Sequence, residues 1–167
     1  MTNELILIFD FGSQFAQLIA RRVRELNVFC QVVRSDITAE RVKQLKPKGI
    51  ILSGGPASVY EAAAPKFDPK VLETGIPILG ICYGMQLLAH NLGGKVGGTA
   101  HTREYGRATL MVSDPNSLFR GYPTESTVWM SHGDQVQNAG TGFVPLASTD
   151  SSGKWARTEL LHELNQL

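Results

Sequence analysis

Apolar and polar residues alternate in blocks along the first 94 residues of the chain. Four mainly apolar runs have the length of a strand, namely Leu5–Phe9, Val28–Val33, Gly49–Leu52 and Pro77–Ile81. Such runs are typical of strands that other elements cover on both faces, as in parallel sheets. The pattern therefore predicts four buried parallel strands.

Segments with helical periodicity lie between these strands. The first places apolar residues at helical spacing and predicts a face toward the sheet: Phe15, Leu18, Ile19, Val23 and Leu26. Further helices are expected from the N-cap Thr38 through Leu45, over Pro69–Thr74, and over Met85–Leu92 before Gly93-Gly94. This alternation predicts the fold class α/β, with an open, doubly wound, mixed and mostly parallel sheet and helices on both faces. A site in such a fold lies at the carboxyl ends of the strands.

The pattern becomes β-rich beyond Lys95. Strands are expected over Ala108–Val112, Thr127–Met130 and Phe143–Ala147, either as a continuation of the same sheet or as an added antiparallel layer. From Trp155 onward the chain has a helical pattern with one apolar stripe, formed by Leu160, Leu161 and Leu164.

Composition narrows the class of protein. Sixteen Lys and Arg against fifteen Asp and Glu give a net charge of +1, which argues against a polybasic nucleic-acid or membrane-surface protein. With 43% apolar and 19% charged residues, the chain is neither disordered nor a coiled coil, and its 167 residues suit one domain. Two cysteines make no disulfide scaffold, and the run Leu5–Phe9 is too short for a signal peptide or membrane span. We therefore expect a cytoplasmic protein.

The strongest chemical signal is the segment Gly80-Ile81-Cys82-Tyr83-Gly84-Met85-Gln86. A strand leads into a cysteine, and a helix follows at once, as in the nucleophile elbow of α/β hydrolases. The glycines permit the sharp turn, the helix N-terminus favours a thiolate, and the amide of Tyr83 points at an oxyanion. A small buried cysteine at a strand end is the competing explanation. Cys30 lacks this context, and we expect it to be structural.

Two further segments carry weaker signals. The loop Ser53-Gly54-Gly55-Pro56 follows the third strand, and a glycine amide there can supply a second oxyanion donor. Alone the loop is only a turn signal, and no phosphate-binding glycine motif is present. His132, in Trp129-Met130-Ser131-His132-Gly133-Asp134, is either a general base for Cys82 or a loop histidine that orients substrate. No Cys or His lies at metal-ligand spacing from Cys82, so no metal site is expected.

Taken together, five segments resemble the class I (triad-type) glutamine amidotransferase family, and within it the GMP synthase group. They match in order and spacing: Asp10-Phe11-Gly12-Ser13-Gln14, Ser53-Gly54-Gly55-Pro56, the Cys82 elbow, Arg103-Glu104-Tyr105-Gly106 and Trp129-Met130-Ser131-His132-Gly133-Asp134. The elbow is typical of the superfamily, whereas the first and last motifs point to the GMP synthase group. The resemblance covers residues 4 to about 150.

The resemblance implies roles for the matching residues. Cys82 would attack the side-chain amide of glutamine, and the amides of Gly55 and Tyr83 would form the oxyanion hole. The residues implied to hold the glutamine are Gln86, Ser131, Gly133 and Asp134, and His132 then belongs to the substrate loop instead of acting as the base. The ammonia would pass to an ATP-pyrophosphatase (synthetase) domain or subunit that converts XMP to GMP. ATP, magnesium and XMP would belong to that partner, so no cofactor is expected in this chain.

The departure from the family concerns the catalytic base. The family uses a histidine in a His-Pro-Glu motif after a late strand, and this sequence contains no His-Pro-Glu. We expect an amidotransferase-like domain over residues 1–150 that lacks its C-terminal part, through truncation or a frameshift, and a non-matching tail over 151–167. On the expected helix, His162 and Glu163 would point about 100° apart, so Glu163 could not easily orient His162. Glutamine turnover is therefore expected to be impaired.

Two other functions remain open at this point. The chain could be a non-catalytic partner that binds a synthetase or glutamine without hydrolysing it. It could also be an α/β cysteine hydrolase that acts on another amide or ester. Ammonia release separates the first alternative from an amidotransferase, and protection of Cys82 by glutamine separates the second.

Overall fold

The structure is a computed structural model that describes residues 4–97, 104–115, 118–132, 134–149 and 160–162. The chain divides into two compact units. One comprises residues 1–88 together with 161–167, and the other comprises residues 89–160.

The first unit contains the alternating elements that the apolar pattern predicts. In chain order they are β1 (Leu5–Asp10), α1 (Ala16–Glu25), β2 (Phe29–Arg34), α2 (Ala39–Leu45), β3 (Gly49–Leu52), the 3-10 helix η1 (Pro69–Glu73), β4 (Ile78–Gly80) and the start of α3 (Tyr83–Asn91). The sheet order is β10-β4-β3-β1-β2, where β10 is Leu160–His162. The pairs β1–β2, β1–β3 and β3–β4 are all parallel. The predicted α/β fold class is therefore confirmed.

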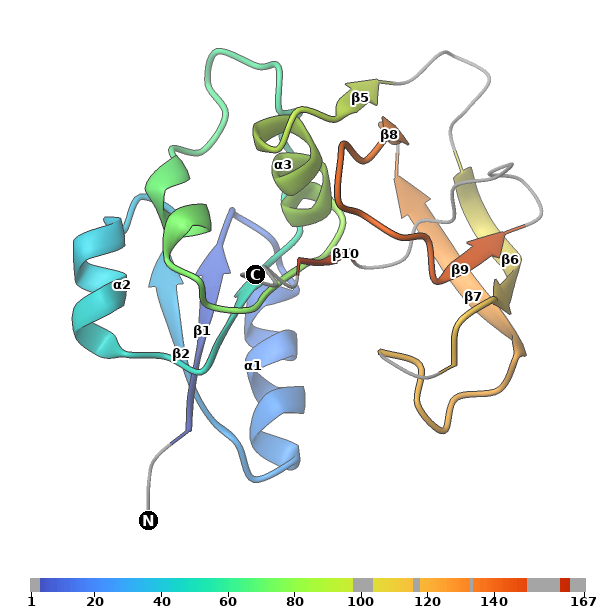
Figure 1. Ribbon diagram of the computed structural model, residues 1–167, viewed down its shortest axis with the longest axis horizontal. Helices are drawn as coiled ribbons and strands as arrows, with labels where there is room; N and C mark the ends of the chain where they lie inside the picture. The colour runs from blue at the N-terminus through green and yellow to red at the C-terminus, as the bar shows by residue number, and fades with distance from the viewer. Residues whose placement is uncertain (1–3, 98–103, 116–117, 133, 150–159, 163–167) are drawn as a thin grey trace. The chain divides into compact units, whose positions relative to one another are not determined.

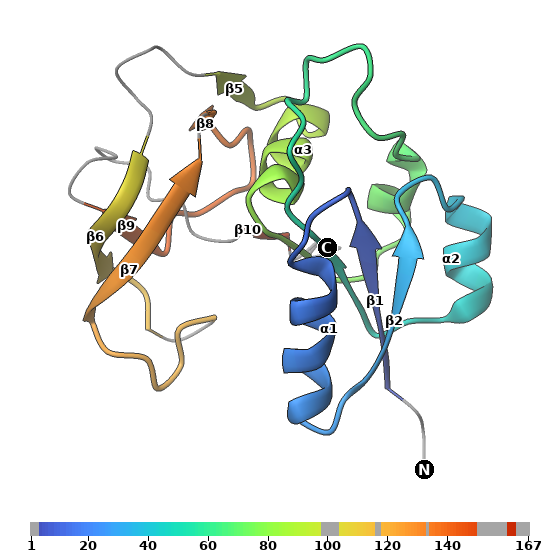
Figure 2. The same cartoon turned by 180° about the vertical axis from the view of Figure 1, so that it is seen from behind.

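The order of the strands places the helices on two faces. The chain moves from β1 to β2 in one direction and then returns past β1 to β3. Because crossovers between parallel strands are right-handed, a reversal of direction puts successive helices on opposite faces of the sheet. Figures 1 and 2 accordingly show α1 and α2 on opposite sides of β1 and β2.

Small residues let α1 approach the sheet. Its buried residues are Ala16 and Ala20, and Ala20 packs in a core with Ile8 and Cys30. Ile19 and Val23 also pack against this core, as expected. The other members of the predicted apolar face point outward instead: Phe15 is 63% exposed, Leu18 45% and Leu26 77%. That part of the prediction was wrong because alanines, with little apolar area to signal a buried face, form the contact.

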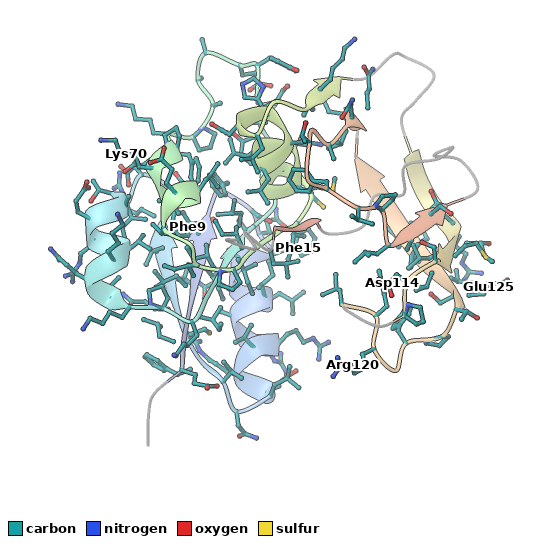
Figure 3. The ribbon with its side chains drawn as sticks, in the orientation of Figure 1. Phe9, Phe15, Lys70, Asp114, Arg120 and Glu125 are labelled. Carbon is teal, nitrogen blue, oxygen red and sulfur yellow. The ribbon has the colours of Figure 1, made fainter. Side chains whose placement is uncertain are left out.

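The opposite face of the sheet carries the aromatic core. Phe9 lies on the side that holds η1 (Figure 3), and its ring centroid is 6.1 Å from that of Phe67. Next to Phe67, the carboxylate of Asp68 accepts hydrogen bonds from the amide of Ala39 at 2.8 Å and from that of Lys70 at 3.1 Å. One side chain therefore caps the first turns of both α2 and η1.

The second unit is antiparallel. Its strands are β5 (Lys95–Gly97), β6 (Glu104–Val112), β7 (Glu125–His132), β8 (Gln135–Asn138) and β9 (Ala147–Thr149). They form a two-stranded sheet, β5-β8, and a three-stranded sheet, β7-β6-β9. Of the two expectations, a continuation of the parallel sheet is therefore wrong, and these strands form separate antiparallel sheets. The sequence pattern did not predict the short strands β5 and β8. The strand expected over Phe143–Ala147 is observed further along the chain, as β9.

The end of the chain corrects one expectation. Leu160–His162 form a strand, β10, instead of part of a helix. The backbone there pairs with the sheet beside β4, and this pairing decides the conformation of an apolar run too short for its period to be diagnostic. Leu164 lies outside the described residues.

Within the described ranges, no helix is long and apolar enough to cross a membrane.

The double cap formed by Asp68 can be tested by substitution. Asp68→Ala removes the acceptor for two helix-terminal amides, and we expect it to lower the free energy of unfolding by about 1–2 kcal/mol. Asp68→Asn keeps one amide oxygen as an acceptor and should lose less. Urea denaturation of the two variants measures the difference, with Thr38→Ser, which keeps the hydroxyl cap of α2, as the control. Equal stability of Asp68→Ala and the unchanged protein would show that these caps contribute nothing.

Candidate functional site

Cys82 lies at a sharp turn between β4 and α3. Its φ of +49° is in the left-handed region, which residues other than glycine rarely adopt. The turn is held on both sides, because the amide of Ile81 donates to the carbonyl of Leu52 at 2.9 Å and that of Gly84 donates to the carbonyl of Ser53 at 3.1 Å. Cys82 itself is exposed. The strained turn therefore presents a thiol at the carboxyl end of the sheet, as a nucleophile elbow does.

The two glycines of the elbow are required by close backbone contacts. A Cβ at Gly84 would lie 2.3 Å from the carbonyl oxygen of Leu52, and a Cβ at Gly80 would lie 2.7 Å from the amide of Met85. Both distances are far below the closest normal contact of a carbon atom. Because backbone atoms cannot turn aside as side chains do, only glycine fits at these two positions.

The loop after β3 lies beside the cysteine. A Cβ built on Gly54 would be 3.5 Å from the Cβ of Cys82 and 3.7 Å from the hydroxyl of Ser13. The backbone at Gly55 lies against the carbonyl oxygen of Phe11, only 2.7 Å from where a Cβ would be. The turns that follow β1, β3 and β4 therefore meet at one edge of the sheet.

The side chain of Tyr83 packs into the core at this edge of the sheet. Its ring is buried, with its centroid 5.3 Å from that of Phe11. Burial, and to a smaller extent the negative charge of Glu61, raises the pKa of the Tyr83 phenol. The side chain is thus neutral near pH 7 and contributes packing, whereas its amide is among the first of α3, which have no acceptor within their own helix.

The remaining candidates for glutamine binding are divided between the two units. Gln86 is buried on α3, and its backbone N–H donates to the carbonyl of Cys82 at 3.1 Å. Ser131 lies in β7 opposite Tyr105, and Asp134 lies half-buried between β7 and β8. Gly133 is outside the described residues. The first unit holds Gly55, Cys82, Tyr83 and Gln86. The role of Ser131, Gly133 and Asp134 in glutamine binding stays a prediction.

The described histidines lie in different elements, and His101 is outside the described residues. His90 is exposed on α3, and His132 is in β7 opposite Glu104. His162 ends β10, the strand next to β4. The helical geometry expected at His162 was therefore wrong, and Glu163 lies outside the described residues. Among the described residues, no three His, Cys, Asp or Glu side chains gather as a metal site would require.

Ser53 is the residue whose importance the sequence analysis missed. It is 0% exposed, and its hydroxyl accepts a hydrogen bond from the amide of Phe11 at 3.2 Å and donates one to the carbonyl of Gly54 at 2.8 Å. A signal was present, because a serine directly after a buried strand must satisfy its hydroxyl locally. Cys30, by contrast, is a core residue as expected, 2% exposed, with its thiol 3.4 Å from the carbonyl of Ala20.

The fold and the elbow define a class of protein. A family model, Glutamine amidotransferase class-I, matches residues 7–165, and the chain belongs to this family. Within the family, the chain is a glutamine amidotransferase domain homologous to the glutaminase domain of GMP synthases.

Named relatives support the GMP synthase type. A "GMP synthase [glutamine-hydrolyzing]" of Prochlorococcus marinus is 53% identical over 150 residues, which are 90% of this chain and 28% of that protein. The protein of the same name from Synechocystis sp. is 49% identical over 152 residues, or 91% of this chain and 28% of the relative. The chain thus spans less than a third of the length of these curated relatives.

Solved structures agree with this assignment. A Thermoplasma acidophilum protein, provisionally named as one of the subunits of a GMP synthase, has a TM-score of 0.78 and 30% identity, and the match covers 90% of this chain and 75% of that one. A glutamine amidotransferase of Thermotoga maritima, at 20% identity and a TM-score of 0.66, covers 90% of this chain and 69% of its own. At that identity the second match shows the shared fold alone.

The close contact at Gly84 gives a direct test of the elbow. Gly84→Ala drives a methyl group into the end of β3, and we expect a loss of about 1–3 kcal/mol of stability. Gly97→Ala is the matched control, because its Cβ would meet only the flexible side chain of Gln137, at 3.6 Å. Urea unfolding compares the two. Equal stability of Gly84→Ala and Gly97→Ala would contradict the observed packing of α3 on β3.

Proposed function

We propose that this chain binds glutamine and attacks its side-chain amide with the thiol of Cys82. The observation that carries the proposal is the exposed Cys82 at a positive φ, directly beside the glycine loop. The sulfur adds to the amide carbon, and the amides of Gly55 and Tyr83 bind the oxygen as it gains negative charge. The carbon–nitrogen bond then breaks, and the nitrogen leaves as ammonia with the proton that the thiol gave up. Water hydrolyses the thioester to glutamate and frees the thiol.

The proposal also assigns residues that hold the glutamine. Gln86, Ser131, Gly133 and Asp134 are the residues that the family resemblance assigns to substrate binding. Asp134 suits the α-ammonium group of the substrate because it supplies a negative charge. Gln86 is one helical turn from Cys82, which supports a position near the reacting amide.

The ammonia has a consumer outside this chain in our proposal. We infer an ATP-pyrophosphatase domain or subunit, which would bind ATP, magnesium and XMP and produce GMP. Support comes from the relatives, which are called GMP synthases and are more than three times as long as the matched region. The Thermoplasma protein, named as a subunit, supports an arrangement in separate chains. This chain would need no cofactor of its own and would act in the cytoplasm.

Specific binding of glutamine can be detected through Cys82. A chloromethyl-ketone analogue of glutamine should alkylate Cys82, and millimolar glutamine should slow this reaction, whereas glutamate or asparagine should protect much less. Mass spectrometry of the peptide that contains residue 82 gives the rate. Equal protection by all three amino acids would favour a cysteine hydrolase that acts on a different amide or ester.

Turnover should be slow, because the sequence has no His-Pro-Glu to hold a base. An oriented general base contributes about 10²–10⁴-fold, so we expect kcat for ammonia release below that of family members that have the motif by a similar factor. Cys82→Ala should remove the remaining activity. His162→Asn is the decisive second variant, and we expect it to change nothing. A large loss in that variant would show that His162 serves as the base, and wild-type turnover equal to that of the relatives would contradict the expected impairment.

A further inference from the structure

We propose that Ser53 is a positioning residue that sets the direction of the Gly55 amide. This inference rests on the proposed function, in which that amide binds the oxyanion. The relevant contact is the hydrogen bond from the Ser53 hydroxyl to the carbonyl of Gly54, at 2.8 Å. This carbonyl and the N–H of Gly55 belong to the same peptide group.

A peptide group is planar, and its C=O and N–H point in opposite directions when the bond is trans. The chain has no cis peptide bond among its described residues. A hydroxyl that holds the carbonyl of Gly54 toward Ser53 therefore turns the N–H of Gly55 away from Ser53. The hydroxyl acts on the oxyanion hole without touching the substrate.

This peptide group needs such a restraint because it joins two glycines. Without Cβ atoms, rotation about the bonds on either side meets little steric resistance. A half-turn of the plane would exchange the N–H for the carbonyl oxygen, and a partial negative charge would then face the developing oxyanion. Pro56 limits the conformation of Gly55 on its far side only, since the residue before a proline is restricted to extended backbone.

Ser53 is well placed to supply the restraint. Its amide donates to the carbonyl of Phe9 at 3.1 Å, and its carbonyl accepts from the amide of Gly84, also at 3.1 Å. Its hydroxyl oxygen accepts from the amide of Phe11 at 3.2 Å. The residue is fully buried, and its single hydroxyl proton is committed to Gly54. Ser53 thus links the turns after β1, β3 and β4 through bonds on every polar atom it has.

The test compares two reactions of Cys82 that differ in their need for an oxyanion hole. With the chloromethyl-ketone analogue of glutamine, the sulfur adds to the ketone carbon and the oxygen becomes an anion. The sulfur then displaces chloride from the neighbouring methylene carbon, its bond to the former ketone carbon breaks as the carbonyl reforms, and a thioether remains. With iodoacetamide, the sulfur displaces iodide directly and no oxyanion forms. The rate constant for the ketone divided by that for iodoacetamide therefore reports on the oxyanion hole, separately from the exposure and ionisation of the thiol.

Ser53→Ala should lower this ratio at least tenfold, since loss of one oxyanion donor costs about 10²–10³-fold in acyl transfer and misorientation costs part of that. Ser53→Cys, which keeps a weak donor, should fall between. The matched control is Thr74→Val, which also removes a hydroxyl that donates to a backbone carbonyl, that of Val71 at 2.7 Å. The control should leave the ratio unchanged.

The outcomes separate the two proposals. If glutamine does not slow the ketone reaction of the wild-type chain, both the proposed function and this inference are overturned. If glutamine protects and the ratio in Ser53→Ala equals that of the wild type, only the role of Ser53 is overturned. A parallel fall of both rate constants, or unfolding of both Ser53 variants, would also overturn it, because Ser53 would then be needed for the fold alone.

Discussion

The approach of α3 to the end of β3 is the contact on which the site depends. The backbone of Gly84 lies against the carbonyl of Leu52 so closely that no side chain fits between them. This contact fixes where the helix begins, and the start of the helix fixes the strained turn at Cys82. A methyl group at the contact would displace the thiol along with the helix. Glycine at position 84 is therefore required by the proposed chemistry, although it contributes no functional group.

The same principle extends to the neighbouring loops. Gly55 lies against the carbonyl of Phe11, and the ring of Phe11 packs against that of Tyr83. Three turns that are far apart in the sequence are thus held together by backbone contacts and by the hydrogen bonds of one buried serine, Ser53. Such contacts leave little freedom at the edge of the sheet, and a preorganised edge is what electrostatic stabilisation of an oxyanion requires.

The sequence was sufficient for the parallel sheet and the elbow, because both leave local signals. Buried parallel strands appear as apolar runs, and the elbow appears as glycines at fixed positions around Cys82. The failures have physical causes. Alanines, not Phe15 and Leu18, face the sheet from α1, and Leu160–His162 became a strand through pairing in the sheet. The hydrogen bond from the Phe11 amide to the Ser53 hydroxyl joins residues 42 positions apart, and no local pattern encodes that contact.

The contrast between the two cysteines has a practical consequence. Cys30 is buried in the core between α1 and the sheet, whereas Cys82 is exposed. A thiol reagent small enough to reach the elbow will therefore count one equivalent per native chain and two per unfolded chain. The number of thiols that react per chain therefore measures the folded fraction of a sample, and no label has to be introduced by mutation.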